Sequence, residues 1–258
     1  MTRAEQEVYL LRELMKEQPH YWGTEIPRRP EERQMLLRAL FNVRPPAPVS
    51  AAFQQVQDAY LQAVTEEKGV TDAETPPFIR PKICLWQGDI TTLRTDAIVN
   101  AANDQLLGCF LPCHGCIDNA IHTFAGVQLR LACWKLMRDQ EKAEKPGCAK
   151  ITPGFNLPAR YVLHTVGPVI RGPLTTADCN QLTGCYRSCL ELAEKNRLES
   201  VAFCCISTGE FHFPRQEAAE IAVRTVIEFL ASSDAVHRVI FNVFQDEDRQ
   251  IYQKLLQG

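Results

Sequence analysis

Short apolar runs alternate with longer amphipathic segments from Pro81 onward, and this alternation limits the possible folds more than any other feature of the chain. Runs rich in β-branched and aromatic residues predict strands, whereas apolar positions three and four residues apart predict helices. The expected strands are Ile83–Trp86, Ala97–Asn100, Tyr161–Val166, Val201–Ile206 and Val239–Phe244, with a weaker one at Cys148–Thr152. The expected helices are Ile117–Asp139, Asp178–Asn196, Arg215–Ser232 and Glu247–Gln257. Strands that alternate with helices predict an α/β fold, in which helices cover both faces of a central, largely parallel sheet.

Residues 1–80 have a different pattern, which predicts a helical region. Three amphipathic stretches, around Leu11, Leu36 and Val56, are separated by proline-containing breaks. Proline lacks a backbone N–H donor and ends a helix when it falls in the interior, so these breaks separate three helices. We therefore expect a helical N-terminal extension at 1–80, followed by an α/β domain at 81–258.

The charge balance and the distribution of apolar residues exclude two classes of partner. The 28 Lys and Arg residues nearly cancel the 31 Asp and Glu residues, and the net charge of −3 gives no general attraction to nucleic acid or anionic membranes. The first residues contain no apolar signal segment, and no stretch approaches the roughly 18 unbroken apolar residues of a membrane span. We expect a cytoplasmic protein. The 11 cysteines, an odd number, favour reduced thiols and a metal site over a disulfide framework.

Three segments at the ends of expected strands carry residues that a packed core does not require. Gly88-Asp89-Ile90-Thr91 is by itself typical of a tight turn in which Asp89 caps backbone amides. Asn100-Ala101-Ala102-Asn103 is either a turn or a pair of amides that bind sugar hydroxyls. Ser207–Pro214 offers successive backbone N–H groups before a helix, as in a diphosphate-binding loop, although a plain strand-to-helix connection is similar. Ligands of parallel sheets bind at the carboxyl ends of the strands, where all three segments lie.

These segments also occur in the order found in one known family. Gly88-Asp-Ile-Thr, Asp96-Ala-Ile-Val-Asn-Ala-Ala-Asn103, His164-Thr-Val-Gly-Pro168 and Ser207-Thr-Gly-x-Phe-x-Phe-Pro214 resemble the motifs of macrodomains, the ADP-ribose-binding fold. The resemblance covers about residues 81–258. It implies a three-layer α/β/α domain with a mixed, largely parallel sheet, and ADP-ribose as the ligand.

The loop after the Asn-Ala-Ala-Asn motif departs from common macrodomains, which carry a run of glycines there. Cys109, Cys113, His114 and Cys116 fall within eight residues, and soft thiolates with an imidazole suit zinc. The loop matches the motif Gly-Cys-Phe-x-Pro-x-His-x-Cys-Ile-Asp-Asn of the zinc-dependent macrodomains, bacterial and fungal protein-ADP-ribose hydrolases with a helical N-terminal extension. This resemblance spans nearly the whole chain and implies one zinc ion per chain, with Cys109, His114 and Cys116 as ligands. In the alternative, Cys113, at a variable position of the motif, completes a closed structural site.

The resemblance further implies which residues hold ADP-ribose. Asp89 accepts a hydrogen bond from the adenine amino group, and Phe244 stacks on the adenine ring. Backbone amides of Ile90 and of the Ser207 segment bind the diphosphate, while Asn100 and Asn103 hold the distal ribose. The implied ligand-binding residues are Asp89, Ile90, Asn100, Asn103, Ser207, Thr208, Gly209, Glu210, Phe211 and Phe244.

Asp118, Asn100 and Asn103 are the candidate catalytic residues. Asp118 follows the last implied metal ligand by two residues, so it either orients a water or ribose hydroxyl at the metal or caps the helix that starts there. His122, one helical turn further, is by itself typical of a satisfied interior histidine. Six further residues lie among apolar neighbours in expected strands and helices, and we expect their side chains in the core: Phe241, Cys133, Cys185, Cys189, Cys204 and Cys205.

These features together predict a zinc-dependent hydrolase that removes ADP-ribose from mono-ADP-ribosylated protein side chains. Two alternatives remain open, because function belongs to a site rather than to a fold. One is a non-catalytic reader that binds ADP-ribose and carries a structural zinc, and the other is an O-acetyl-ADP-ribose deacetylase. The family resemblance implies a sirtuin-type ADP-ribosyltransferase and a lipoyl-carrier protein as partners.

Overall fold

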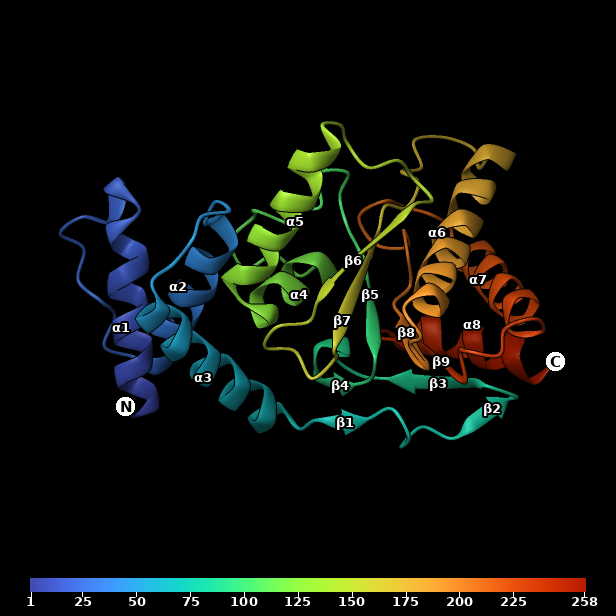
Figure 1. Cartoon of the computed structure of the whole chain (residues 1–258), viewed down its shortest axis with the longest axis horizontal. Helices are drawn as coiled ribbons and strands as arrows, with labels where there is room; N and C mark the ends of the chain where they lie inside the picture. Colours follow the sequence, from blue (N-terminus) through green and yellow to red (C-terminus); the bar gives the residue numbers. More distant parts are fainter.

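The computed structural model describes all residues from Met1 to Gly258, arranged around a central seven-stranded sheet (Figure 1). The strand order is β2-β3-β9-β8-β5-β7-β6. The inner strands are parallel to one another, whereas the two edge strands, β2 and β6, run antiparallel to their neighbours. The strands are β2 (Phe78–Arg80), β3 (Ile83–Gln87), β5 (Ala97–Ala101), β6 (Ala149–Pro153), β7 (Tyr161–Thr165), β8 (Ser200–Phe203) and β9 (Arg238–Val243). The prediction of a mixed, largely parallel sheet is confirmed.

All six expected strands are present, and each begins and ends within one residue of the expected bounds except at the end of β8. β8 stops at Phe203, three residues earlier than expected, because Cys204–Ile206 leave the sheet and lead into the following loop. β2 was not expected, nor was the small parallel pair formed by β1 (Thr71–Asp72) and β4 (Leu93–Arg94).

Helices cover both faces of the sheet, as the alternating pattern predicts. α4 (Ile117–Ala125) and α5 (Val127–Gln140) lie on one side of it, and α6 (Thr176–Lys195), α7 (Arg215–Leu230) and α8 (Asp246–Gln257) form a layer on the other (Figure 1). The short 3-10 helix η2 (Ile90–Thr92) follows β3. A continuous core of 47 buried apolar residues fills the space between the layers, and every residue of β9 is buried. Burial on both faces explains why this strand is an unbroken apolar run in the sequence.

The single helix expected at Ile117–Asp139 is wrong, because the structure has two helices there. The chain turns at Gly126, where φ is +91° and ψ is 175°, a conformation that favours glycine. A Cβ at this position would lie 2.7 Å from Gln57 Nε2, and the Gln57 side-chain oxygen accepts a hydrogen bond from Val127 N at 3.0 Å. The side chain of Gln57, in the N-terminal region, therefore caps the first residue of α5, and the local helical pattern of the sequence does not reveal this break.

The N-terminal residues form the three expected helices, α1 (Arg3–Lys16), α2 (Pro30–Val43) and α3 (Ala51–Lys68), with a 3-10 turn η1 (Pro19–Tyr21) after the first. A separate cluster of 11 buried residues consists of ten residues from their apolar faces and Val127 at the start of α5. α2 and α3 both pack against α4. The boundary at residue 80 stays a prediction, although β2 already belongs to the central sheet. None of the helices combines the length and apolar character that crossing a membrane requires.

Candidate active site

A cleft of about 700 Å³ opens at the carboxyl ends of the parallel strands. Four segments line it: the end of β5 with the loop after it, Gly167 after β7, the loop between β8 and α7, and the end of β9 with the residues that follow it. We call residues 106–116 the cysteine loop and residues 204–214 the serine loop. The volume is in the range of sites for small molecules and cofactors.

The serine loop presents unused backbone donors to this cleft. The N–H groups of Gly209, Glu210 and Phe211 donate to no acceptor of the protein. The loop holds its shape through bonds from His212 N to Gly209 O at 3.0 Å and from Phe213 N to Ser207 O at 2.9 Å. Three successive free N–H groups at the approach to α7 form a concave site for a phosphate or other anion.

Ser207 has an unusual backbone conformation in the serine loop, and Gly167 of another motif packs against it. Ser207 has a φ of +64°, and its buried hydroxyl has no partner within the protein. A Cβ added to Gly167, in the segment after β7, would lie 1.9 Å from Ser207 Oγ. Any larger residue at position 167 would therefore have to displace the Ser207 side chain, and the close approach of the two segments shapes this wall of the cleft.

Asp118 is buried at the cleft and is held by the two asparagines of the motif after β5. Its carboxylate accepts from Asn100 Nδ2 at 2.8 Å and from Asn103 Nδ2 at 3.4 Å. Burial raises the pKa of Asp118 to about 6, against the effect of the Asn100 bond. The N-cap alternative for Asp118 is wrong, because Cys116 is the N-cap residue of α4 and Asp118 is two residues inside the helix, facing inward.

A hydrogen-bonded chain extends from Asp118 into the core. Asn100 Nδ2 also lies 3.2 Å from His164 Nδ1, and His164 Nε2 lies 2.9 Å from Thr152 Oγ1. An amide nitrogen only donates, so His164 accepts at Nδ1 and carries its proton on Nε2. Burial lowers the pKa of His164 to about 3 and keeps the ring neutral. The orientation of the Asn100 amide is thereby fixed from both sides.

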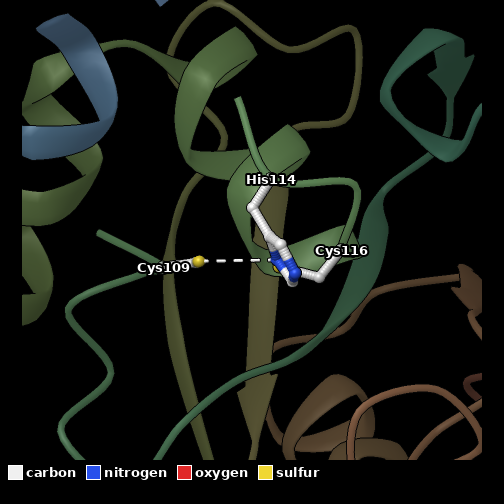
Figure 2. Close-up of side chains that lie close together, drawn as sticks. All are labelled: Cys109, His114 and Cys116. Carbon is white, nitrogen blue, oxygen red and sulfur yellow. Dashed lines mark hydrogen bonds between the residues drawn. The ribbon is translucent and has the colours of Figure 1, made fainter. Parts of the chain in front are cut away.

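The cysteine loop brings three metal-ligand side chains together (Figure 2). Cys109 Sγ lies 3.6 Å from His114 Nδ1, and the donor atoms of Cys109, His114 and Cys116 are all within 4.8 Å of one another. Burial raises the pKa of Cys116 to about 12, and the neighbouring Cys109 thiol adds to this effect. A bound divalent cation favours the thiolate forms instead. The other ring nitrogen of His114 faces Glu210 Oε1 on the serine loop at 3.7 Å.

Cys113 lies apart from these three donors. Its Sγ faces the carbonyl oxygen of Met35 in α2 at 3.4 Å, so the structure does not assemble a four-residue ligand set. A second group, His122, Cys133 and His164, also has metal-ligand spacing but is fully buried. In this group His164 already bonds Thr152 and Asn100 through its two nitrogens.

The structure places most of the predicted site residues at the cleft. Asn103, Cys109, His114, Cys116, Asp118, Ser207, Thr208, Gly209, Glu210, Phe211 and Phe244 line it, and Asp89, Ile90 and Asn100 do not. The carboxylate of Asp89 caps Thr91 N at 3.0 Å and pairs with Lys68 of α3 at 2.9 Å, which is the turn geometry that the short motif predicts by itself. Ile90 is buried in η2 beside it. Asn100 is fully buried behind Asp118.

The core predictions are largely confirmed. Phe241 is buried against Tyr252, while Phe244 is 73% exposed at the cleft. Four of the five cysteines expected in the core are buried and Cys205 is half-buried. His122 is interior as expected, but the prediction of a satisfied histidine is wrong. Neither ring nitrogen has a hydrogen-bond partner, although Nε2 lies 3.5 Å from Asp118 Oδ1, and burial holds the pKa of this ring well below its usual value.

Several residues that contact the site carry no signal in the sequence. Arg38 and Asn42 of α2 and Arg130 of α5 bond the cysteine loop from outside the cleft. Each lies on an ordinary amphipathic helix, where Arg and Asn are typical of a solvated face. Only the three-dimensional arrangement shows their partners.

Comparisons with known proteins agree with this geometry. The Macro domain family profile matches residues 99–222. A protein-ADP-ribose hydrolase of Treponema medium is 51% identical over 99% of this chain and 100% of its own length. A probable bifunctional ADP-ribose hydrolase/ADP-ribosyltransferase of Fusarium oxysporum f. sp. cubense is 43% identical over 86% of this chain and 40% of its own length.

Among solved structures, the Trypanosoma brucei macrodomain in complex with ADP-ribose has a TM-score of 0.66 and 33% identity, over 84% of this chain and 94% of that one. Identity of about one half along nearly the full length, the shared fold and a cleft with free amides at the carboxyl ends of the strands lead to one assignment. The chain belongs to the macrodomain family of protein-ADP-ribose hydrolases.

Proposed function

We propose that this hydrolase releases ADP-ribose from mono-ADP-ribosylated protein side chains, with one zinc ion held by Cys109, His114 and Cys116. One observation carries the proposal: the three donors and the Asp118 carboxylate line the same cleft as the free amides of the serine loop. A ligand whose diphosphate lies on those amides therefore has its reacting end within reach of both groups.

The donor set fits zinc in its chemistry. Two thiolates and one imidazole are soft and borderline ligands that zinc prefers, and three protein ligands leave a fourth position for water or substrate. When bound, zinc supplies Lewis-acid polarisation of a substrate oxygen or lowers the pKa of a water. Glu210, opposite the second nitrogen of His114, is placed to orient the imidazole, as carboxylates beside metal-ligating histidines do.

The residues of the chain then have distinct tasks. The amides of Gly209 to Phe211 bind the diphosphate, and the exposed ring of Phe244 offers a stacking face for adenine. The proposal keeps Asp89 at the adenine amino group and the backbone amide of Ile90 at the diphosphate, although neither residue lines the cleft. Asn103 contacts the distal ribose, and Asn100, buried behind Asp118, acts on that ribose through the carboxylate that it orients. Asp118, with its raised pKa, holds or accepts a proton from the attacking water or from a ribose hydroxyl.

The assay that tests this function compares two substrates, each in the presence and absence of a zinc chelator. The protein is incubated with a mono-ADP-ribosylated protein and, separately, with O-acetyl-ADP-ribose, each with and without a zinc chelator, and free ADP-ribose is measured. The proposal expects release from the protein substrate that the chelator abolishes. Binding of ADP-ribose without release would favour the reader, and release from the acetylated metabolite alone would favour the deacetylase.

Substitution of Gly209 by Val tests the placement of the diphosphate. A Cβ at Gly209 meets no protein atom within 4 Å, so the substitution is expected to leave the fold unchanged. The added side chain obstructs the approach of a ligand to the neighbouring amides, and ADP-ribose affinity measured by calorimetry should fall by about tenfold or more, the loss of at least one hydrogen bond to a charged group. Zinc content should be unchanged. Affinity equal to that of the unaltered protein would place the diphosphate elsewhere.

Substitution of Cys113 by Ala tests the closed-site alternative. The Cys113 thiol faces Met35, so zinc measured by elemental analysis should stay near one per chain. Loss of zinc in this variant would show that Cys113 is a fourth ligand and that the site is structural.

The partners are a further part of the proposal. The name of the Fusarium relative joins an ADP-ribose hydrolase to an ADP-ribosyltransferase in one chain. This supports a transferase that supplies the substrate of the present protein, for which the family resemblance suggests a sirtuin-type enzyme and a lipoyl-carrier protein as the modified target.

A further inference from the structure

Helix α2 of the N-terminal region contacts the backbone of the cysteine loop directly. Arg38 Nη2 donates to the carbonyl oxygen of His114 at 3.0 Å and to Asn119 Oδ1 at 3.0 Å. One helical turn further, Asn42 Oδ1 accepts from the backbone N–H of Cys113 at 2.9 Å. Positions 38 and 42 lie on one face of α2, so a single helix face forms hydrogen bonds to the backbone of two successive loop residues, Cys113 and His114.

One of these hydrogen bonds is made to a loop residue with a left-handed backbone conformation, Cys113. Cys113 has a φ of +54°, a left-handed conformation that is unfavourable for a residue with a Cβ. The next residue is His114, whose imidazole must point toward Cys109 and Cys116. The Asn42 bond to Cys113 N therefore stabilises a turn that the loop sequence does not favour by itself.

Both groups that reach the loop are themselves anchored. Asn42 is buried, and its Nδ2 donates to Thr123 Oγ1 in α4 at 2.9 Å. Asn119, the second acceptor of Arg38, is also buried, and its own Nδ2 donates to the carbonyl oxygen of Leu111 at 3.0 Å. The contacts join α2, α4 and the second half of the loop in one network.

The first half of the loop is tied to the same helix through Arg130 of α5. Its Nε donates to the carbonyl oxygen of Leu107 at 2.7 Å, and its guanidinium lies 4.2 Å from the ring centre of Phe110. Nη1 of the same group donates to the carbonyl oxygens of Phe41, at 3.2 Å, and of Arg44, at the C-terminal end of α2. Carbonyl groups at a helix C-terminus attract a cation, so α2 also holds the residue that fixes the start of the loop.

We propose that α2 is a brace for the zinc site and that Arg38 and Asn42 are positioning residues, which set how tightly and how long the metal stays bound. This inference rests on the zinc site proposed above. Neither side chain contacts a metal-ligand atom or lines the cleft, so both act through the backbone of residues 113 and 114.

The test measures zinc affinity rather than turnover. Arg38→Ala and Asn42→Ala are compared with the unaltered protein by zinc competition with a colour-forming chelator, which gives the dissociation constant and the dissociation rate. Loss of an outer contact that orients a metal ligand weakens metal binding by about 10- to 100-fold, and we expect an effect of this size with faster dissociation. Arg38→Lys keeps one donor and should recover part of the affinity.

A matched control separates positioning from loss of stability. Arg33 lies on the same helix but pairs with Glu7 of α1 at 2.9 Å, away from the loop. Arg33→Ala should lower the melting temperature of the metal-free protein, as is expected of Asn42→Ala, yet keep zinc affinity within about threefold, the scatter of perturbations that share no partner with the loop.

The outcomes distinguish this inference from the zinc proposal. Unaltered protein that binds no zinc would overturn the zinc proposal and the brace with it. Tight zinc binding in the unaltered protein, with equal affinity in Arg38→Ala and Asn42→Ala, would overturn the brace alone. Equal weakening in Arg33→Ala would also overturn it, because stability would then explain the effect. If Asn42→Ala does not fold, Arg38→Ala and Arg38→Lys still decide the question.

Discussion

Replacing Cys116 with Ser is expected to remove zinc from the proposed site and to lower the single-turnover rate of ADP-ribose release by about 100-fold or more, since a catalytic metal contributes several kcal/mol to transition-state stabilisation. The fold should survive. Cys116 is the N-cap residue of α4, but its side chain makes no capping bond, and serine is a better cap than cysteine. ADP-ribose affinity should fall much less than turnover, because the metal acts mainly on the transition state.

Elemental analysis, single-turnover release and calorimetry on the same preparation check this prediction. Cys148 is exposed and distant in sequence from the cysteine loop, so Cys148→Ser is the matched control and should keep zinc and full turnover. Full activity of the Cys116→Ser variant without zinc would disprove a catalytic role of the metal.

The second large effect is expected at Asp118, whose substitution by Ala should lower turnover by about 100-fold, the contribution of a positioned acid–base group. The carboxylate faces the cleft from a buried position, and Asn100 and Asn103 fix its two oxygens. Asp118→Asn is the informative companion, because an amide keeps the volume and still accepts from Asn100 Nδ2 but takes no proton.

Single-turnover kinetics on both variants, with zinc content measured in parallel, distinguish two roles of Asp118. Equal losses in Asp118→Ala and Asp118→Asn support proton transfer or charge. Near-normal turnover in Asp118→Asn would show that the carboxylate serves only to position its neighbours. Near-normal turnover in both variants would remove Asp118 from the mechanism.

The fold was predictable because its signal is local. Apolar runs such as Val239–Phe244 and the helical spacing of Arg215–Ser232 are visible in short windows, and the structure has strands and helices there within a few residues. The break at Gly126 was not predictable, because its cause is Gln57, a residue 69 positions earlier in the chain. β8 also ends earlier than its apolar pattern suggests, because Cys204 to Ile206 are apolar residues that belong to the serine loop rather than to the sheet.

The site was predictable where a motif is continuous in the sequence. The candidate metal-binding group of Cys109, His114 and Cys116 comes from one loop, and the free amides come from another. Motif position could not show that Asn100 lies behind Asp118, because that depends on how α4 crosses β5. It could not show the contacts of Arg38 and Asn42 either, since these join segments more than 70 residues apart.

The hydrogen bonds between α2 and the cysteine loop have one more consequence, which follows from thermodynamic reciprocity. If docking of α2 strengthens zinc binding by some factor, then zinc must strengthen the docking of α2 by the same factor. The N-terminal helices would therefore report on metal occupancy from outside the cleft, and their resistance to local opening would rise as zinc is loaded. An agent that loosens these helices would in turn act as an inhibitor of the enzyme without entering its substrate site.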